Sequence, residues 1–298
     1  MIKGGYTVIK KTKGEKVFNV FNVVFMLIFA FLTLYPFYYV AIASLSKSSD
    51  FMMYSGFLYK PLGFNIDAYR VVFRDSRILR GFANTVFILI TRVSLSMLLT
   101  IMGAYVLSRK KARLVPRLMF LIVVTMFFTG GMIPIYLNVR SLGLDNNMGA
   151  LIFPGVINSF NLIIMRNAFE AIPNELEESA SIDGAGSLST LFTIMLPLIV
   201  PNVMVVLLYY AVEVWNSWFD AMLYIRKKNL YPLQLILREI LINNNTNGMT
   251  ANSSGDSVTM AETVQYAVMM VATVPILLVY PFLQKYFVNG IMVGAVKG

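Results

Sequence analysis

The chain contains neither cysteine nor histidine. The absence of Cys excludes disulfides, thiolate chemistry and iron–sulfur ligation, and the absence of His removes the commonest zinc ligand and the most frequent general base. The sequence also has no Gly-x-x-x-x-Gly-Lys-Ser/Thr phosphate loop, so any ATP would be hydrolysed on another polypeptide. We therefore predict a non-enzymatic chain with no catalytic residue, no metal site and no cofactor of its own.

Charged residues are scarce as well. Asp, Glu, Lys and Arg make up 13% of the 298 residues, whereas a soluble domain carries about 25%. Hydrophobic residues make up 57% of the chain, and the mean hydropathy is +0.69. These values predict an integral membrane protein. The net charge of +10 does not indicate nucleic acid binding, because the basic residues cluster at the edges of apolar segments, where they act as topology signals.

Six segments are apolar enough to cross a membrane, which takes about 20 residues of helix. They are residues 18–46, 82–108, 118–139, 146–165, 188–212 and 263–284. We therefore predict an all-α polytopic protein with one transmembrane domain over 18–284, between a basic leader (1–17) and a tail (285–298). The first span is an anchor and not a cleavable signal, because its apolar run is about twice the usual length and lacks a small-residue cleavage site.

The basic residues beside the spans predict the orientation. The short segment from Arg109 to Arg117 holds five of them, which places it in the cytoplasm. Both termini and the polar segment 167–190 are then cytoplasmic. Residues 47–80 would lie outside, either as an interfacial helix or as a contact surface for a delivery protein, and Asn243–Ser257 would be a solvated external loop.

The polar segment between the fourth and fifth spans carries the most informative motif. It contains Glu178-Ser-Ala-Ser-Ile-Asp-Gly184, followed by Ile194-Met-Leu-Pro197. This pattern resembles the cytoplasmic loop with which permeases of ATP-binding cassette importers bind their ATPase: Glu-Ala-Ala, three residues, Gly, nine residues and Ile-x-Leu-Pro. Ser179 is the departure from that pattern. The resemblance implies an ATPase-docking site formed by Glu178, Ser179, Ala180, Asp183, Gly184, Ile194, Leu196 and Pro197.

The composition of this loop also predicts its shape. Acidic residues in the first turns favour a helix that begins near Glu175, because they complement the helix dipole. Gly184 interrupts the pattern, so we expect two short helices joined at glycine. Because the loop runs through Leu196-Pro197 into the fifth span, movement of a docked ATPase would move that span.

Other segments are similar to the second permease of maltose-type carbohydrate importers. They are Gly130–Pro134, Leu142–Leu144, Ala150–Pro154, Asn161–Arg166 and Phe169–Pro173. The segments Trp215–Asp220, Pro232–Leu235 and Tyr280–Tyr286 look more like the branch that handles oligosaccharides, including uronate-containing ones. The resemblance implies the type I importer permease fold in a bacterial cell membrane. It also implies a homologous partner permease, two ATPase copies that bind ATP and Mg²⁺, and an extracytoplasmic sugar-binding protein.

Sugar contacts are expected from aromatic faces and from amide or carboxylate side chains. The candidates in the chain are Asn158, Asn161, Tyr209, Glu213, Trp215, Asn216 and Trp218. For Trp215 and Trp218 the alternative is an interfacial aromatic belt at the end of the fifth span.

Arg92 and Glu213 are the ionisable residues within the apolar spans or at their outer ends. A charge in the bilayer must face the protein interior or water, so both residues either form a pair or line the transport path. A proton- or sodium-coupled secondary sugar transporter that uses these two residues is the alternative to an importer permease, and a structural membrane scaffold is a third possibility.

Overall fold

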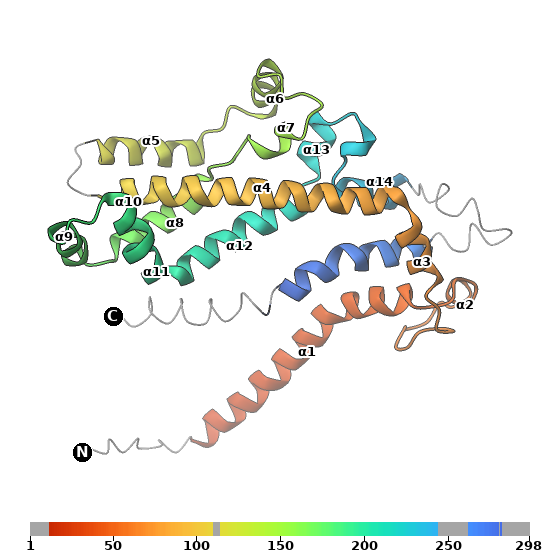
Figure 1. Ribbon diagram of the computed structural model, residues 1–298. Helices are drawn as coiled ribbons and strands as arrows, with labels where there is room; N and C mark the ends of the chain where they lie inside the picture. The colour runs from red at the N-terminus through yellow and green to blue at the C-terminus, as the bar shows by residue number, and fades with distance from the viewer. Residues whose placement is uncertain (1–11, 110–113, 244–261, 280, 282–298) are drawn as a thin grey trace.

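The computed structural model describes residues 12–109, 114–243, 262–279 and 281 (Figure 1). These residues form helices and irregular segments without a strand, which confirms the prediction of an all-α protein. Most of the basic leader, most of the external loop Asn243–Ser257 and the tail from 285 lie outside the described residues, as do 110–113 in the basic segment.

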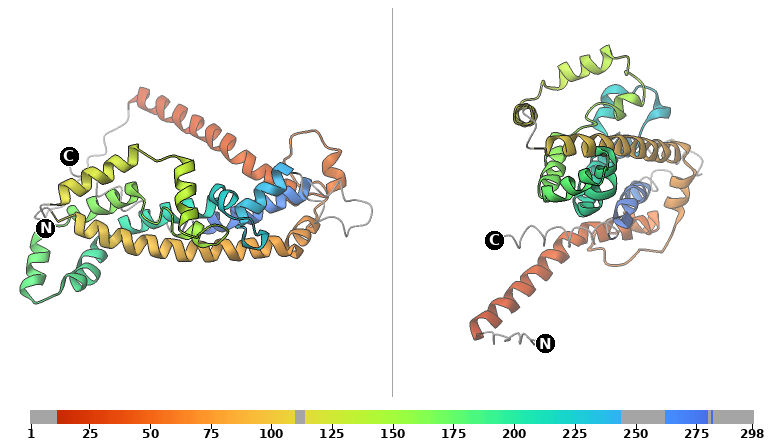
Figure 2. Two further views of the ribbon diagram at one scale, coloured as in Figure 1. Left: turned by 90° about the horizontal axis from the view of Figure 1, so that it is seen from above. Right: turned by 60° about the vertical axis from the view of Figure 1, so that its left-hand side comes forward.

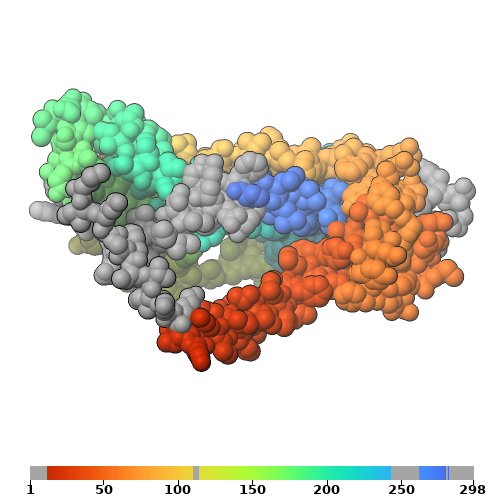
Figure 3. Space-filling model, turned by 90° about the horizontal axis from the view of Figure 1, so that it is seen from below, coloured from red at the N-terminus to blue at the C-terminus, as the bar shows by residue number. Residues whose placement is uncertain are grey.

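Helix α1, Lys13–Ser44, stands apart from the rest of the molecule. It begins with a capping box, in which Thr12 and Glu15 satisfy each other's backbone N–H groups. None of its most apolar 18-residue window is buried, and the helix diverges from the body toward its amino-terminal end (Figure 3). Its last turn packs on α2, Ser48–Met52, through Ile42, Ala43, Phe51 and Leu58. The apolar surface of α1 therefore has to be covered by lipid or by another protein.

Helix α4, Ser76–Leu107, runs along the body from end to end (Figures 1 and 2). It follows the short helix α3, Asp67–Arg74, whose Val72 is buried. Around α4 pack α8, Ser159–Glu170, α12, Val200–Asn216, and α14, Leu233–Asn243. The main core is formed by apolar side chains of these helices: Met97, Ile101, Ala104, Leu162, Met165, Val206 and Tyr210. A second core joins α3 and α14 to the helix Glu262–Val279.

The segment predicted as the third span is divided into two helices. Helix α5, Val115–Phe127, and α6, Met132–Ser141, meet at an angle of 114°. The chain turns at Gly130-Gly131, where Gly131 has a φ of 83°, a backbone conformation that favours glycine.

The segment predicted as the fourth span is interrupted too. A single turn, α7, Gly149–Ile152, precedes α8, and the intervening residues include Pro154 and Gly155. Gly155 has a φ of 70°, so a continuous helix is not possible there.

The count of six spans is therefore not confirmed. Among the described residues, three helices are long and apolar enough to cross a membrane, or up to five if each of two bent pairs is one span. The two pairs are α5 with α6 and Ser187–Leu198 with α12.

A buried hydrogen-bond network joins three of the central helices. The Tyr210 hydroxyl on α12 lies 2.8 Å from Thr100 Oγ1 on α4, and it accepts from the Asn158 N–H at the start of α8 at 3.0 Å. Tyr210 and Thr100 are fully buried. The hydroxyl therefore satisfies a backbone group that the interruption before α8 leaves without a helical partner.

We expect Tyr210→Phe to destabilise the protein by about 2 kcal/mol, because it leaves two buried polar groups without their partner. The measurement is the free energy of unfolding in detergent micelles. Tyr209→Phe is the matched control: its hydroxyl is on the exposed side of the same helix, and the expected change is below about 0.5 kcal/mol. Equal stabilities of the two variants would contradict the role of this network.

Candidate functional site

The predicted docking loop forms helix α9, Asn174–Ile182, at one end of the molecule (Figure 1). Pro173 precedes it, and Glu175 and Glu177 lie in its first turn, as the dipole argument predicts. Gly184 follows with a φ of 79° and ends the helix, while the Ala185 N–H donates to the Ala180 carbonyl at 2.9 Å. The expectation of two short helices joined at glycine is met, because a second helical segment starts at Ser187.

The docking residues divide into an exposed group and an anchored group. The exposed residues are Glu178, Ser179, Asp183 and Gly184. Ala180 lies on the inward side of α9 and is buried. The side chain of Ile182 is 87% exposed, so α9 ends in an apolar tip. Ile182 is not among the predicted docking residues, although an apolar residue between Ser181 and Asp183 is a visible signal in the sequence.

The anchored group lies in the second helical segment. It consists of α10, Ser187–Ser189, a π-helix, Thr190–Met195, and α11, Leu196–Leu198. Ile194 and Leu196 are partly buried against the main core, and their neighbours Leu191 and Met195 are fully buried in it. Pro197 is exposed. The motif thus joins a projecting helix to a segment embedded in the core.

Between this segment and α12 the chain bends by 89° at Ile199. The expectation that the loop continues directly into the fifth span needs this correction. Pro197 and Pro201 flank the bend, and each lacks a backbone N–H and clashes with the preceding turn. Ile199 itself is buried in the main core, so the bend is packed against other helices and not free in solvent.

A second connection joins α9 to the end of α4, and we call it the α9–α4 contact (Glu177, Tyr105 and Arg109). Glu177 accepts a hydrogen bond of 2.9 Å from the Tyr105 hydroxyl and forms an ion pair with Arg109. The Arg109 guanidinium lies 4.1 Å from the centroid of the Tyr105 ring. Burial lowers the pKa of Arg109, while its interaction with Tyr105 acts in the opposite direction. The guanidinium stays charged, because its ordinary pKa is far above neutrality.

This contact was not predicted from the sequence. Arg109 was interpreted as a topology signal and the acidic residues at the start of α9 as complements of the helix dipole, and no spacing rule relates residues so far apart in the chain. The contact means that α9 is attached to the body at two places, the core segment before α12 and the end of α4.

Four polar side chains lie on one exposed face of α12, which we call the α12 polar face: Asn202, Tyr209, Glu213 and Asn216. Their spacing of seven, four and three residues is helical, so they form one stripe. The adjacent side of the helix, about a quarter turn away, buries Val206, Tyr210 and Val214. Three of the predicted sugar-contact residues are therefore together on this face, and Asn202 extends it.

The other predicted sugar-contact residues have different positions. Asn158 caps α8 by accepting from the backbone N–H groups of Phe160 and Asn161, and Asn161 is buried. Trp215 is buried and donates its indole N–H to the Ala272 carbonyl at 3.2 Å. Trp218 lies 4.5 Å beneath the guanidinium of Arg238. These four do not join the α12 polar face.

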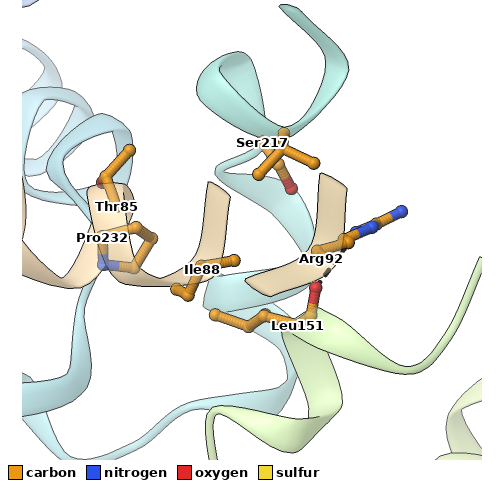
Figure 4. Close-up of a pocket in the computed structure, with 7 residues that line it drawn as sticks. Thr85, Ile88, Arg92, Leu151, Ser217 and Pro232 are labelled. Atoms are coloured by element: carbon orange, nitrogen blue, oxygen red, sulfur yellow. Dashed lines mark hydrogen bonds between the residues drawn. The ribbon is translucent and has the colours of Figure 1, made fainter. Parts of the chain in front are cut away.

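Arg92 and Glu213 form an ion pair with a separation of 3.1 Å between Nη2 and Oε1. Arg92 also donates from Nη1 to the Leu151 carbonyl at 3.1 Å (Figure 4). It lines a pocket with Thr85, Ile88 and Pro232 that has a volume of about 10 Å³, roughly enough for one water molecule. This pocket cannot hold a sugar ring, so a sugar would have to meet the pair from the exposed side of Glu213.

These features define a class: a helical membrane protein with a projecting helix attached to its core, and a polar face on a helix that is otherwise apolar. No family model matches the chain. It is 41% identical to the polygalacturonan/rhamnogalacturonan transport system permease protein YtcP of Bacillus subtilis, over 95% of this chain and 99% of the relative. It is 39% identical to protein LplC of the same organism, over 96% of this chain and 97% of the relative.

A solved structure has the same fold. It is a chain of a bacterial ABC transporter involved in the import of the acidic polysaccharide alginate, with a TM-score of 0.89, 34% identity, and coverage of 94% of this chain and all of that one. This protein belongs to the family of permease subunits of carbohydrate ATP-binding cassette importers.

Loss of the α9–α4 contact should loosen α9. For Glu177→Ala we expect amide hydrogen exchange in 174–182 to be about ten times faster, because a charge-assisted hydrogen bond and an ion pair are lost. Glu175→Ala is the matched control. It removes a carboxylate from the same helical turn, and that carboxylate has no partner among the described residues. Equal acceleration in both variants would show that only the helix dipole is affected.

Proposed function

We propose that this subunit forms a path for an oligosaccharide together with a homologous permease, and that ATPase subunits bound at α9 move it. ATP and Mg²⁺ would bind on those ATPase chains. The observation that carries the proposal is the construction of α9: an exposed helix with an apolar tip, attached both to α4 and to the segment before α12. The relatives named as transport system permeases support the same role.

We further propose that α9 and both termini are cytoplasmic and that six spans cross the bacterial cell membrane in the type I importer arrangement. The bent pairs α5–α6 and Ser187–α12 would each count as one span, and 146–170 would be an interrupted one. The described start of α1 points toward the end of the molecule where α9 lies, which agrees with a cytoplasmic amino terminus (Figures 1 and 2).

The cargo we propose is a uronate-containing oligosaccharide that an extracytoplasmic binding protein delivers. Two proteins at more than 30% identity are named for acidic polymers, polygalacturonan/rhamnogalacturonan and alginate.

Ile182→Asp should release the ATPase without disturbing the permease. Ile182 is 87% exposed within the described part of the chain, so a docked partner would bury it, and a buried unpaired carboxylate is costly there. We expect the ATPase that purifies with the complex to fall at least about tenfold. The amount of inserted permease should stay the same.

Met53→Asp is the control for this experiment, because Met53 is 89% exposed near α2, at the other end of the molecule. It should retain the ATPase. Full retention of the ATPase by Ile182→Asp would exclude the tip of α9 from the docking surface.

Uptake assays separate an importer subunit from an ion-coupled transporter. Vesicles with the complete complex should take up a labelled galacturonate trimer only with ATP inside and binding protein outside. Vesicles with this chain alone and an imposed proton or sodium gradient should take up none. Gradient-dependent uptake by the single chain would support the secondary transporter instead.

A further inference from the structure

The ion pair between Arg92 and Glu213 is unequally placed in the protein. The Arg92 side chain is 7% exposed, whereas the Glu213 side chain is 46% exposed on the α12 polar face. Because Glu213 stays accessible in this chain, the pair does not carry the cost of burying both charges. The carboxylate of Glu213 is therefore accessible at the surface of the chain, whereas the guanidinium of Arg92 is buried.

Arg92 is fixed from several sides. Its Nη1 donates to the Leu151 carbonyl, and a Cβ added at Gly155 would lie 3.1 Å from its Nη2. Nε is buried without a hydrogen-bond partner among the described residues. The guanidinium is therefore a stationary donor, and its contact with Oε1 sets the direction of the Glu213 carboxylate.

The second carboxylate oxygen of Glu213 has no partner within the described part of the chain. Oε1 is the oxygen that Arg92 contacts, and an ionised carboxylate can accept further hydrogen bonds at each of its oxygens. Oε2 therefore remains available as an acceptor on the exposed side of α12.

An aromatic surface lies one helical turn away. Tyr209 is 43% exposed, and its ring centroid is 6.2 Å from that of Phe160, which is also exposed. Residues four apart on a helix have Cβ atoms about 5–6 Å apart. Tyr209 and Glu213 thus present an aromatic ring beside a hydrogen-bond acceptor. Sugars have a matching combination, an apolar C–H face and hydroxyl donors.

We propose that Tyr209 and Glu213 form a sugar-binding surface, in which Glu213 accepts hydrogen bonds from ring hydroxyls of a sugar packed on Tyr209. Arg92 is a positioning residue that acts through Glu213. The inference rests on the proposed transport function, and it names this subunit's own contact with the cargo. The recognised groups are hydroxyls, so the surface would bind an acidic sugar and its neutral ester alike.

The test measures binding to the purified full-length chain in detergent and does not depend on transport. A fluorotyrosine resonance, assigned to Tyr209 by its loss in Tyr209→Phe, is followed while a galacturonate trimer or its methyl ester is added. Both should shift the resonance in the wild-type chain. Glu213→Gln should weaken binding of both about tenfold, since a hydrogen bond to a charged acceptor is replaced by a neutral one.

A double-mutant cycle tests the role of Arg92. Arg92→Gln should weaken binding about as much as Glu213→Gln, and the double variant should be no weaker than either, because Arg92 acts through Glu213. Glu262→Gln, at an exposed carboxylate that begins another helix, is the matched control and should bind as the wild type does.

Three results would overturn the inference. They are no shift of the Tyr209 resonance, an unchanged sugar affinity in Glu213→Gln, and a loss of affinity in the double variant that equals the product of the losses in the two single variants. Tighter binding of the acidic trimer alone by Glu213→Gln would mean that Arg92 receives the sugar carboxylate in place of Glu213. Uptake by the wild-type complex without sugar binding at Tyr209 would refute this surface and leave the proposed function intact. Sugar binding at Tyr209 without ATP-dependent uptake would support this surface and refute the proposed transport function.

Discussion

The structure depends on one constraint: backbone groups at helix interruptions need hydrogen-bond partners where membrane lipid supplies none. Helix α4 provides them from a row of polar side chains. Thr85 accepts from the Leu233 N–H, Arg92 donates to the Leu151 carbonyl, and Asn84 donates to carbonyls of Asn229 and Tyr231. Thr100 contacts the Tyr210 hydroxyl, which accepts from the N–H of Asn158. A continuous, apolar helix thus supports the broken ones around it.

The two functional regions follow from this arrangement. Because Thr100 of α4 contacts the Tyr210 hydroxyl that accepts from the Asn158 N–H, α8 can start beside this polar network, and α12, which carries Tyr210, follows a bend of 89°. Helix α9 is attached to the end of α4 through Glu177 and to α12 through the bend. Under the proposed function, displacement of α9 would be passed to two helices that also carry Arg92 and Glu213, the latter on the α12 polar face.

Local sequence signals predicted the helical class, the two short helices around Gly184 and several exposed polar residues of α12, because each depends on composition or short spacing. The sequence marks the helix interruptions less clearly. Pro154, Pro197 and Pro201 fit simple kinks as well as breaks, and Gly131 reveals a turn only through its φ of 83°. Contacts such as Glu177 with Arg109 join residues with no spacing relation, so only the folded chain identifies them. Only the folded chain shows that Trp215 is buried and bonded to the Ala272 carbonyl, which places it away from the other sugar candidates on the α12 polar face.

Helix α1 contacts the rest of the described chain mainly through an aromatic cluster at its carboxyl end, where Tyr39, Phe51 and Tyr266 meet edge to face. The two larger hydrophobic cores of the described chain contain no residue of α1. Because α1 precedes the body in the chain and buries none of its apolar window there, it can enter the bilayer as an independent helix before the contacts with the body exist. It would then keep the unfinished chain at the membrane while the body assembles beside it.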